Sequence, residues 1–166
     1  VVIAIAMALQ PQLLIADEPT TALDVTIEAQ ILQLMKQLSR DTGMSIIIIS
    51  HNLGVIAEMC DYVYVMYAGK IVEQADVFTL FERPVHPYTQ GLISSIIRLD
   101  ETSRRLSTIP GAVPNLLHLP KGCSFSNRCP AVSAACKQSR PELYDVAPGH
   151  CARCFMLKKE GDGDAC

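Results

Sequence analysis

The order of apolar positions near the start of the chain predicts a strand, a helix and a second strand. Leu13 to Ala16 is a short apolar run, and Ser45 to Ser50 contains four consecutive isoleucines. A β-branched run of that length favours a strand covered on both faces, as in a parallel sheet flanked by helices. Between the two runs, apolar residues recur at helical spacing, with Asp24 as a capping residue and Gly43 at the helix end.

Further apolar runs predict a helix before this unit and several short elements after it. Val1 to Leu9 is expected to form a buried helix, because the proline of Gln10-Pro11 prevents its continuation. Asp76 can cap a short helix that ends before Pro84. The other elements expected are a helix over Leu53 to Cys60, a hairpin of Tyr62 to Tyr67 and Ile71 to Gln74 around Ala68-Gly69-Lys70, and a helix over Tyr88 to Ile97.

Changes in composition divide the 166 residues into four parts. Residues 1–97 carry the periodic apolar patterns of an α/β domain. Residues 98–118 are rich in Arg, Ser, Thr, Pro and Gly and are expected to be a linker. Residues 119–154 form a cysteine-rich segment with few large apolar residues, and residues 155–166 are expected to be a disordered tail. Because the chain starts without Met inside an apolar run, we interpret it as the downstream piece of a longer protein.

Composition and charge narrow the classes of function. Hydrophobic residues make up 49% of the chain, charged residues 19%, and the formal net charge is -3. The sequence has no basic stripe, so nucleic acid is not an expected partner. The longest apolar run, Val1 to Leu9, is well short of the ~20 residues of a membrane-spanning helix. Seven cysteines without a preceding export signal indicate the reducing cytosol, where clustered thiols more often hold metals than form disulfides.

Two adjacent carboxylates, Asp17 and Glu18, follow the first apolar strand. In open α/β sheets, ligands gather at the carboxyl ends of the strands. Asp17 can face a magnesium ion there, because magnesium takes few protein carboxylates and keeps much of its water. Glu18 can point at an attacking water and accept its proton. Alone, the pair is also compatible with an ordinary solvated strand end.

The wider motif resembles the Walker B segment and D-loop of ATP-binding cassette (ABC) proteins. The string from Leu13 to Asp24 carries this resemblance, and His51 stands where that family keeps its switch histidine. The resemblance implies that Glu18 and His51 are catalytic and that Asp17 contacts Mg-ATP. It also implies a D-loop that crosses a dimer interface, formed by Thr21, Ala22, Leu23 and Asp24. The family's phosphate-binding loop and signature motif are not in the sequence, so we expect the chain by itself not to hydrolyse ATP.

Five cysteines cluster in the segment after residue 119. Their spacing is unlike the paired two-residue gaps of common zinc ribbons. The few large apolar residues there bury too little surface to offset the ordering of the backbone, so a structural metal would contribute to folding. A set of thiols without metal remains the alternative. The clustered residues are Cys123, Cys129, Cys136, Cys151 and Cys154.

The cysteine pattern resembles the C-terminal extension of oligopeptide and dipeptide importer ATPases. The landmarks are His86 to Thr89, Pro110-Gly111 and Gly122 to Pro130, followed by a late cysteine. The resemblance implies metal ligands at Cys123, Cys129, Cys136 and Cys154, with Cys151 as the alternative fourth ligand. His150 could substitute for Cys154, and Arg128 could donate hydrogen bonds to cluster sulfurs. The resemblance implies that the bound group is a [4Fe-4S] cluster, with Zn2+ as the second choice.

Together the resemblances imply the C-terminal part of a P-loop ABC nucleotide-binding domain, α/β in class, followed by a small irregular metal-binding extension. The expected function is an ATPase that energises peptide import, with ATP and Mg2+ as cofactors. Expected partners are a second ABC ATPase subunit, identical or sister, transmembrane permease subunits and, indirectly, an external peptide-binding protein. The expected location is peripheral, at the cytoplasmic face of the membrane. The alternatives are an importer ATPase for nickel or another small solute, a soluble ABC ATPase with a zinc module, and a redox-sensing interaction module.

Overall fold

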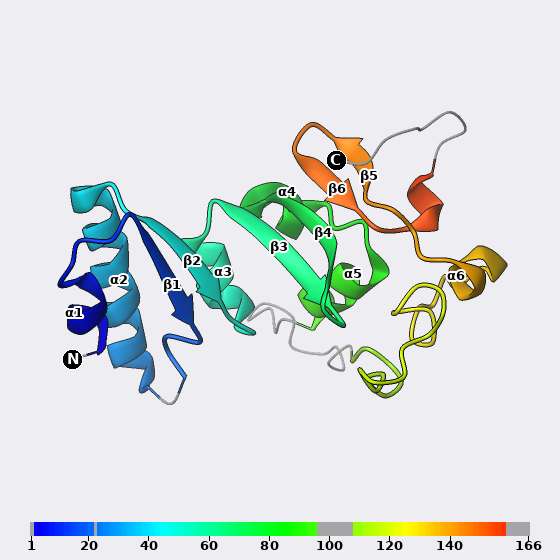
Figure 1. Cartoon of the computed structure of the whole chain (residues 1–166), viewed down its shortest axis with the longest axis horizontal. Helices are drawn as coiled ribbons and strands as arrows, with labels where there is room; N and C mark the ends of the chain where they lie inside the picture. The colour runs from blue at the N-terminus through cyan, green and yellow to red at the C-terminus, as the bar shows by residue number, and fades with distance from the viewer. Residues whose placement is uncertain (1, 22, 96–107, 159–166) are drawn as a thin grey trace, which may run out of the picture. The chain divides into compact units, whose positions relative to one another are not determined.

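The computed structural model describes residues 2–21, 23–95 and 108–158. The chain divides into two compact units, Val1–Cys60 and Asp61–Cys166. The boundary expected between residues 97 and 98 therefore falls inside the second unit. Figure 1 labels the helices and strands of both units. No helix among the described residues combines the length and the apolar character needed to cross a membrane.

The first unit is a strand–helix–strand arrangement preceded and followed by a short helix (Figure 1). β1 and β2 are parallel, and their register runs from Leu13 opposite Ser45 to Asp17 opposite Ile49. The parallel pair with its crossover helix confirms the arrangement predicted from the apolar runs. The elements are α1 (Val2–Met7), β1 (Leu13–Asp17), α2 (Val25–Thr42), β2 (Ser45–Ile49) and α3 (Leu53–Met59).

Local sequence explains the limits of α2. The helix ends at Gly43, whose φ of 70° lies in the left-handed region that glycine adopts without penalty. At the other end Asp24 occupies the N-cap position, but its side chain makes no capping hydrogen bond, so the predicted capping role is wrong in detail. Leu32 and Met35 face inward from α2 and are buried, as is Met44 just before β2. Together with Val55 and Ile56 of α3, these residues form the small core of the unit.

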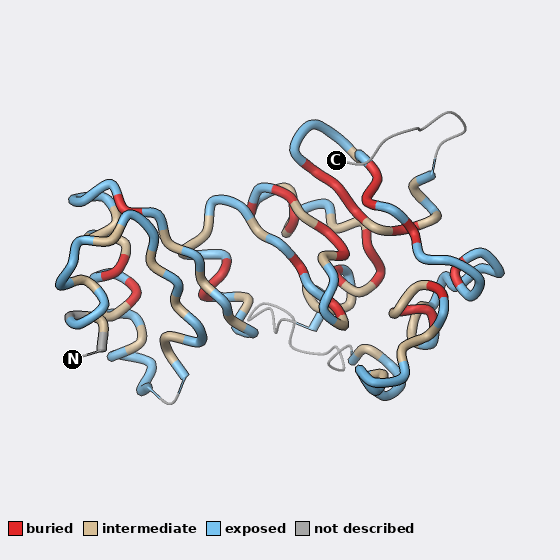
Figure 2. Tube along the Cα trace, viewed as in Figure 1, coloured by how far each residue is buried: buried red, intermediate tan, exposed pale blue. Residues whose placement is uncertain are grey.

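The predicted burial of the first helix and of the isoleucine strand is wrong for this unit. Alternate residues of β2 are exposed, with Ile47 at 48% and Ile49 at 50%. Ile5 in α1 and Leu9 after it are also exposed, as the pale segments in Figure 2 show. The sheet has only two strands among the described residues, and alternate residues of both strands are exposed, so one face of the sheet is open in this unit.

The second unit is built on a four-stranded antiparallel sheet in the order β3-β4-β6-β5. β6 pairs with β4, so a strand from the cysteine-rich segment joins the hairpin that was expected to belong to the preceding domain. The elements are β3 (Tyr62–Tyr67), β4 (Lys70–Asp76), α4 (Val77–Glu82), α5 (Pro87–Ser94), α6 (Ala134–Gln138), β5 (Tyr144–Ala147), β6 (His150–Ala152) and the 3-10 turn η1 (Phe155–Leu157).

Turn and cap residues set the first half of this unit as the sequence predicts. Ala68 and Gly69 both have positive φ, 48° and 76°, and close the hairpin between β3 and β4. The Asp76 carboxylate accepts a hydrogen bond from the Thr79 amide at 3.0 Å and caps α4. The predicted helix over Tyr88 to Ile97 is α5, with Pro87 in its first turn. Residues 96 and 97 lie outside the described part of the chain.

The core of the second unit contains a residue from the cysteine-rich segment. Phe125 is 2% exposed, and its ring packs against Tyr67 and Tyr88 at centroid distances of 5.2 and 5.5 Å. The remaining buried core members come from β3, β4 and α4; they are Val65, Val72, Ala75 and Leu80. Phe125 thus fastens the cysteine-rich segment to the hairpin by aromatic packing.

Two of the predicted irregular regions are only partly described. Of the expected linker 98–118, residues 108–118 contain no helix or strand. Residues 155–157, assigned to a disordered tail, form η1 instead. The rest of that expected tail, from residue 159, lies outside the described residues, as does the linker before residue 108.

Candidate functional site

The parallel pairing of β1 and β2 brings two predicted site residues to the same edge of the sheet. The chain leaves β1 at Glu18, whose amide donates a hydrogen bond to the Ile49 carbonyl at 2.8 Å. His51 follows two residues after that carbonyl. Glu18 has a φ of 44°, in the left-handed region that side-chain-bearing residues rarely adopt. Such backbone strain is found most often where a side chain is held for function.

The Glu18 carboxylate is held at both oxygens. His51 Nδ1 lies 2.8 Å from Oε1, and the Thr21 hydroxyl donates to Oε2 at 2.7 Å. The hydrogen bond from Thr21, followed by that from His51, lowers the pKa of Glu18 below its ordinary value. The carboxylate is therefore ionised near neutral pH, and His51 Nδ1 is then the donor to it. The predicted meeting of this acid and the imidazole is confirmed.

The other residues assigned to ATP and to the D-loop lie around Glu18. Asp17 ends β1 with an exposed side chain, so its carboxylate oxygens are available to a hard cation. The Thr21 amide donates to the Glu18 carbonyl at 3.1 Å, forming a tight turn after the strand. Leu23 is 39% exposed, and Asp24 occupies the N-cap position of α2. Ala22 lies outside the described residues.

A second set of contacts holds the loop that carries His51, and the sequence patterns did not identify it. The Ser50 hydroxyl accepts a hydrogen bond from the Asn52 amide at 3.0 Å. The Asn52 side chain accepts from the Gly54 amide at 2.9 Å and caps α3. Such side-chain to backbone hydrogen bonds are typical of Ser and Asn in the turn before a helix. The sequence Ser-His-Asn is compatible with them, but Ser and Asn are too common in loops to predict them. His51 is thus fixed from both sides of its backbone.

Four predicted metal ligands line one small cavity in the second unit: Cys123, Cys129, Cys136 and Cys154. They come from different segments. Cys123 and Cys129 lie in the turns around Phe125, Cys136 lies in α6, and Cys154 follows β6. The Cys123 amide donates to the Cys136 carbonyl at 2.8 Å, which joins two of these segments directly. His86 also contributes to the wall of the cavity.

The chemistry of the four thiols suits a soft metal, but their arrangement does not by itself form a site. Burial, and then repulsion from neighbouring cysteines, raises the pKa of the Cys123, Cys129 and Cys154 thiols. Clustered thiols with raised pKa values become thiolates when a cation compensates their charge. No group of three His, Cys, Asp or Glu side chains within the described residues has the geometry of a bound metal ion.

Three other residues considered for this site are engaged elsewhere. Arg128 donates to the carbonyls of Pro110 and Ile109, both at 3.0 Å, and its role toward cluster sulfurs stays a prediction. His150 pairs with Glu73, which argues against its use as a ligand. Cys151 is buried in β6 beside the Gln74 side chain and is not among the residues lining the cysteine cavity.

Comparison with known proteins shows what the chain is similar to. Residues 72–136 match the family described as "Oligopeptide/dipeptide transporter, C-terminal region". The chain is 50% identical over 161 residues to the oligopeptide transport ATP-binding protein AppD of Bacillus subtilis, covering 97% of this chain and 49% of the relative. It is 50% identical over 160 residues to the oligopeptide transport ATP-binding protein OppD of Salmonella typhimurium, covering 96% of this chain and 48% of the relative.

Residues 72–136 match the C-terminal region of this transporter family, and nearly the whole chain is similar to ATP-binding proteins of oligopeptide transport. It spans about half the length of the relatives it matches. Among solved structures, it is similar to cbiO1 of Clostridium perfringens, part of the ABC transporter complex cbiONQ. The TM-score of that match is 0.42 and the identity 32%, over 45% of this chain and 30% of the other.

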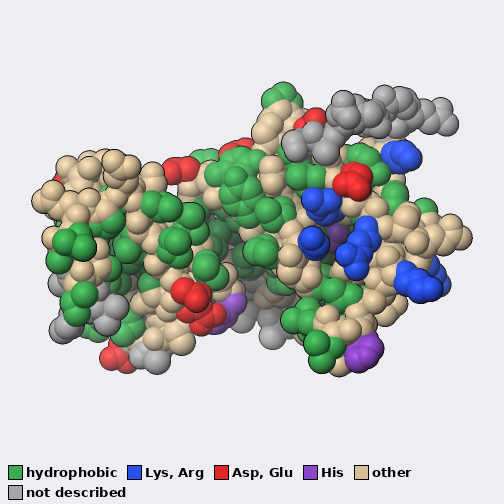
Figure 3. Space-filling view, in the orientation of Figure 1, with side chains coloured by type: hydrophobic (Ala, Val, Ile, Leu, Met, Phe, Trp, Pro, Cys, Tyr) green, Lys and Arg blue, Asp and Glu red, His purple; other side chains and the backbone are tan. Residues whose placement is uncertain are grey.

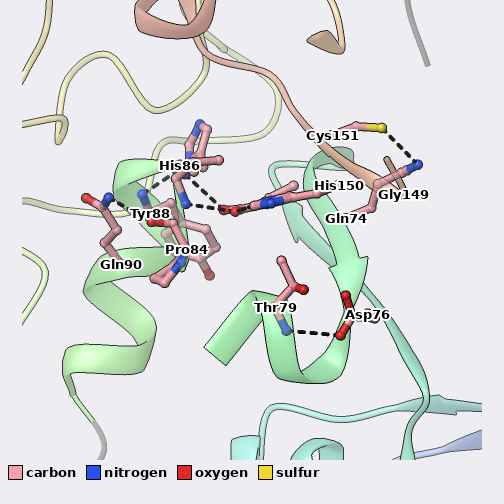
Figure 4. A network of polar contacts seen from close by, with 12 residues as sticks. Gln74, Asp76, Thr79, Pro84, His86, Tyr88, Gln90, Gly149, His150 and Cys151 are labelled. Atoms are coloured by element: carbon pink, nitrogen blue, oxygen red, sulfur yellow. Dashed lines mark hydrogen bonds and ion pairs between the residues drawn. The ribbon is translucent and has the colours of Figure 1, made fainter. Parts of the chain in front are cut away.

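The region matched by the oligopeptide/dipeptide transporter family contains a buried polar network that sequence patterns did not reveal. Glu73 in β4 is fully buried, and its carboxylate accepts from the amides of Val85 and His86 at 2.8 and 2.9 Å. His150 Nε2 donates to the same carboxylate at 2.8 Å, as Figure 4 shows. Glu73 thereby ties β4 to the start of α5 and to β6, and satisfies three donors.

His86 is the second histidine of this network. Its Nδ1 accepts a hydrogen bond from the Tyr88 amide at 3.1 Å, which caps α5. Burial lowers the pKa of His86 to about 4, against the opposing influence of Glu73. The ring is therefore neutral at physiological pH, and the proton is on Nε2 because Nδ1 is an acceptor. The alternation of side-chain direction along Lys70 to Gln74 could have placed Glu73 on the inner face of the hairpin. It could not have identified the residues that donate hydrogen bonds to Glu73.

Proposed function

We propose that this chain supplies the catalytic carboxylate, the switch histidine and the D-loop of an ATPase that energises import of oligopeptides or dipeptides. The observation that carries the proposal is the 2.8 Å contact between His51 Nδ1 and Glu18 Oε1 at the end of two parallel strands. That edge of an open α/β sheet is where nucleotides bind. The assignment to peptides rests on the names of the relatives, which describe oligopeptide transport.

Each residue of the strand edge has a separate task in this proposal. Asp17 would hold the magnesium ion that accompanies ATP and neutralises charge on its phosphates. Glu18 orients the attacking water and accepts its proton, a contribution of ~10² to 10⁴ in rate. Thr21 and His51 keep the Glu18 carboxylate ionised and fixed in direction. His51 donates through Nδ1, which leaves Nε2 to interact with the substrate.

The turn that follows Glu18 gives this ATPase a route to a partner subunit. Thr21 contacts the base directly, and Leu23 and Asp24 are exposed in the same segment. A second ATPase subunit, identical or sister, that packs on this D-loop would therefore sense the position of Glu18. The remaining proposed partners are the permease subunits and, through them, an external peptide-binding protein. The assembly would place the chain at the cytoplasmic face of the membrane.

A chimera tests this proposal. The chain would replace the 161 matching residues of AppD in Bacillus subtilis, the relative with which it shares 50% identity. We expect the chimera to hydrolyse ATP and to restore oligopeptide uptake in a strain without AppD. Glu18→Gln should reduce turnover by about 10² or more while leaving ATP binding intact. Glu58→Gln, which changes another exposed glutamate of the same unit, is the matched control.

The results separate the parts of the proposal. A folded chimera whose turnover is the same with Gln at position 18 would exclude Glu18 as the base. Turnover without uptake would retain the ATPase and exclude the assignment to peptides, leaving nickel or another solute as cargo. The chain by itself should show no steady turnover.

We also propose that Cys123, Cys129, Cys136 and Cys154 hold a structural metal centre, a [4Fe-4S] cluster or, in second place, Zn2+. The support is that these four side chains line one cavity and that burial, followed by repulsion among the thiols, raises the pKa of three of them. Four thiolates suit either group. When bound, the metal would cross-link segments that otherwise share few contacts, which stabilises the fold.

Metal analysis of anaerobically purified chain tests the centre. Iron with acid-labile sulfide indicates the cluster, and zinc indicates the alternative. Absence of both metals would overturn the proposal. Cys154→Ser should lose the metal and Cys151→Ser should keep it, because only the former residue lines the cavity. The reverse result would make Cys151 the fourth ligand. Cys60→Ser in the first unit serves as the control.

A further inference from the structure

A second cavity of about 300 Å3 opens on the second unit. Its size falls in the range of pockets that hold small molecules. β3, β4, the turn around Phe125, the segment after α6 and the chain after β6 all contribute to its wall. The lining residues are Tyr67, Lys70, Val72, Cys123, Ser124, Phe125, Arg140, Pro141, Glu142 and Arg153. Nothing in the proposed ATPase mechanism uses this cavity.

The polar lining of the cavity is mainly cationic. Lys70, Arg140 and Arg153 contribute three positive charges against the single carboxylate of Glu142. Figure 3 shows Lys and Arg side chains gathered on this face of the unit. Neither the Lys70 ammonium group nor the Arg140 guanidinium group forms a hydrogen bond or an ion pair with any residue that the structure describes. The positive charge at the rim is therefore available to an anion.

Arg153 is held rigidly in the wall. Its backbone amide donates to the Val72 carbonyl at 2.8 Å, and its side-chain Nε donates to the Ile71 carbonyl at 2.9 Å. Its Nη1 lies 3.6 Å from the Glu142 carboxylate, which is mostly exposed to solvent, so that ion pair is weak. A guanidinium fixed in this way loses little entropy when it binds a carboxylate or phosphate through two hydrogen bonds.

The floor of the cavity is apolar and includes one hydroxyl group without a hydrogen-bond partner among the described residues. Tyr67, Val72 and Phe125 are each less than 9% exposed. The Tyr67 hydroxyl is buried and has no hydrogen-bond partner among the residues the structure describes. Buried polar groups are normally satisfied, and leaving one without a partner costs about 1 to 3 kcal/mol. The wall therefore combines fixed positive charge, an apolar surface and a hydroxyl that lacks a partner.

We propose that this cavity binds a small organic anion whose carboxylate or phosphate contacts Arg153, Arg140 and Lys70 and whose apolar part lies on Phe125 and Val72. Fixed guanidinium groups bind the oxygens of carboxylates and of phosphates in the same way. The apolar floor selects an anion with a hydrocarbon or aromatic portion over an inorganic ion. This ligand site is distinct from the strand edge at Glu18 and from the cysteine cavity, although Cys123 borders both cavities.

Calorimetric titration of the full chain tests the site with three probes of similar size: 3-phenylpropionate, phenyl phosphate and the uncharged amide 3-phenylpropionamide. We expect saturable binding of one or both anions, weakening with salt, and at least tenfold weaker binding of the amide. The tighter anion identifies the preferred group, and equal affinities indicate recognition of the shared oxyanion. Absence of saturable anion binding at millimolar concentration, or equal affinity for the amide, would overturn the proposal.

Substitutions of exposed charges locate the binding without disturbing the fold. Arg140→Gln and Lys70→Gln should each weaken anion binding about tenfold, because each removes a charge facing the ligand. Glu142→Gln should strengthen it, because Glu142 is the one carboxylate among the described residues that line the cavity. Arg83→Gln changes an exposed arginine of the same unit outside the cavity and should leave the affinity unchanged. Equal effects at Arg83 and Arg140 would show non-specific charge attraction and exclude the site.

Discussion

Glu18 and His51 are separated by 33 residues in the sequence, and their side chains meet at 2.8 Å. Two features of the backbone produce the meeting. The register that pairs Asp17 with Ile49 ends the two strands at the same level. The left-handed conformation of Glu18 and its amide hydrogen bond to Ile49 then turn the glutamate across the end of the neighbouring strand. The motif acts through the pairing of the strands, and the Thr21 hydroxyl, which donates to Glu18 Oε2, is the third member of the contact.

Removing the Thr21 hydroxyl should change the pH profile of hydrolysis. The hydrogen bond from Thr21 is the largest cause of the lowered pKa of Glu18. Thr21→Val raises that pKa, so Glu18 becomes protonated at a higher pH as the solution is acidified. We therefore expect the acidic limb of kcat, measured in the AppD chimera, to move to higher pH. Thr21→Ser should restore the limb, since serine keeps the donor.

Thr20→Val is the matched control, because Thr20 stands next in the sequence and shows no side-chain hydrogen bond to Glu18. If Thr21→Val lowers kcat equally at every pH, the hydroxyl acts on the position of the loop and not on the ionisation of the base.

Sequence alone could predict the first unit because its signals are local and redundant. The isoleucine run, the helical spacing and Gly43 each specify one element, and parallel pairing follows from their order. The exposure of the β2 side chains was predicted less well. The isoleucine run indicates a strand that is covered on both faces, but it does not say whether the covering element belongs to this unit. The Glu18–His51 contact could be predicted because both residues follow strands that the pattern identified.

The second unit was harder to predict because a long-range contact fixes it. His150, Cys151 and Ala152 form β6, yet they show no alternation of apolar and polar residues. Their position depends on pairing with β4 and on the buried hydrogen bond between His150 and Glu73. Those interactions span 77 residues, so no local pattern reports them. The same reason explains why Phe125 was not assigned to the hairpin core.

Gly122→Ala should disrupt the approach of the Cys123 turn to α6. A Cβ at position 122 would collide with the Cys136 carbonyl oxygen and lie 2.8 Å from the Lys137 carbonyl carbon, both backbone atoms. The two segments must separate to relieve this contact, which weakens the hydrogen bond from the Cys123 amide to Cys136. We expect a loss of about 3 kcal/mol in the free energy of unfolding, measured by urea denaturation.

Gly149→Ala provides the comparison for this loss. Gly149 has a φ of 74°, and no atom of the described residues lies within 4 Å of its would-be Cβ, so only the backbone penalty of about 1 kcal/mol applies. If both substitutions destabilise the chain equally, the close approach at Gly122 is not what limits that position.

Glu73→Gln should destabilise the second unit although it changes the volume of the side chain very little. The carboxylate accepts from the Val85 and His86 amides and from His150. An amide group cannot accept at both of its terminal atoms, so one donor is left unsatisfied in a buried site. We expect a loss of about 2 to 4 kcal/mol in urea denaturation followed by far-UV circular dichroism. Glu82→Gln, at an exposed position in α4, should be neutral, and an equally small effect at Glu73 would contradict the role of the network.

Acidification should destabilise the second unit through His86. Burial lowers the pKa of His86 from 6.5 to about 4, while Glu73 opposes the shift in part. Between these two values the unfolded chain binds a proton that the folded chain does not, so the free energy of unfolding falls as the pH falls. The full loss between about pH 7 and pH 4 is on the order of 3 kcal/mol for this group.

His86→Asn isolates this contribution, because asparagine can still cap α5 by accepting from the Tyr88 amide but does not titrate. We expect the variant to lose less stability than the parent chain when urea denaturation is repeated from pH 7 to pH 4.5. His118→Asn, which replaces an exposed histidine, should leave the pH dependence unchanged. Since Glu73 and His150 remain in the variant, the difference between the two slopes reports the neutral, buried state of His86. Parallel slopes would show that His86 is protonated in the folded chain.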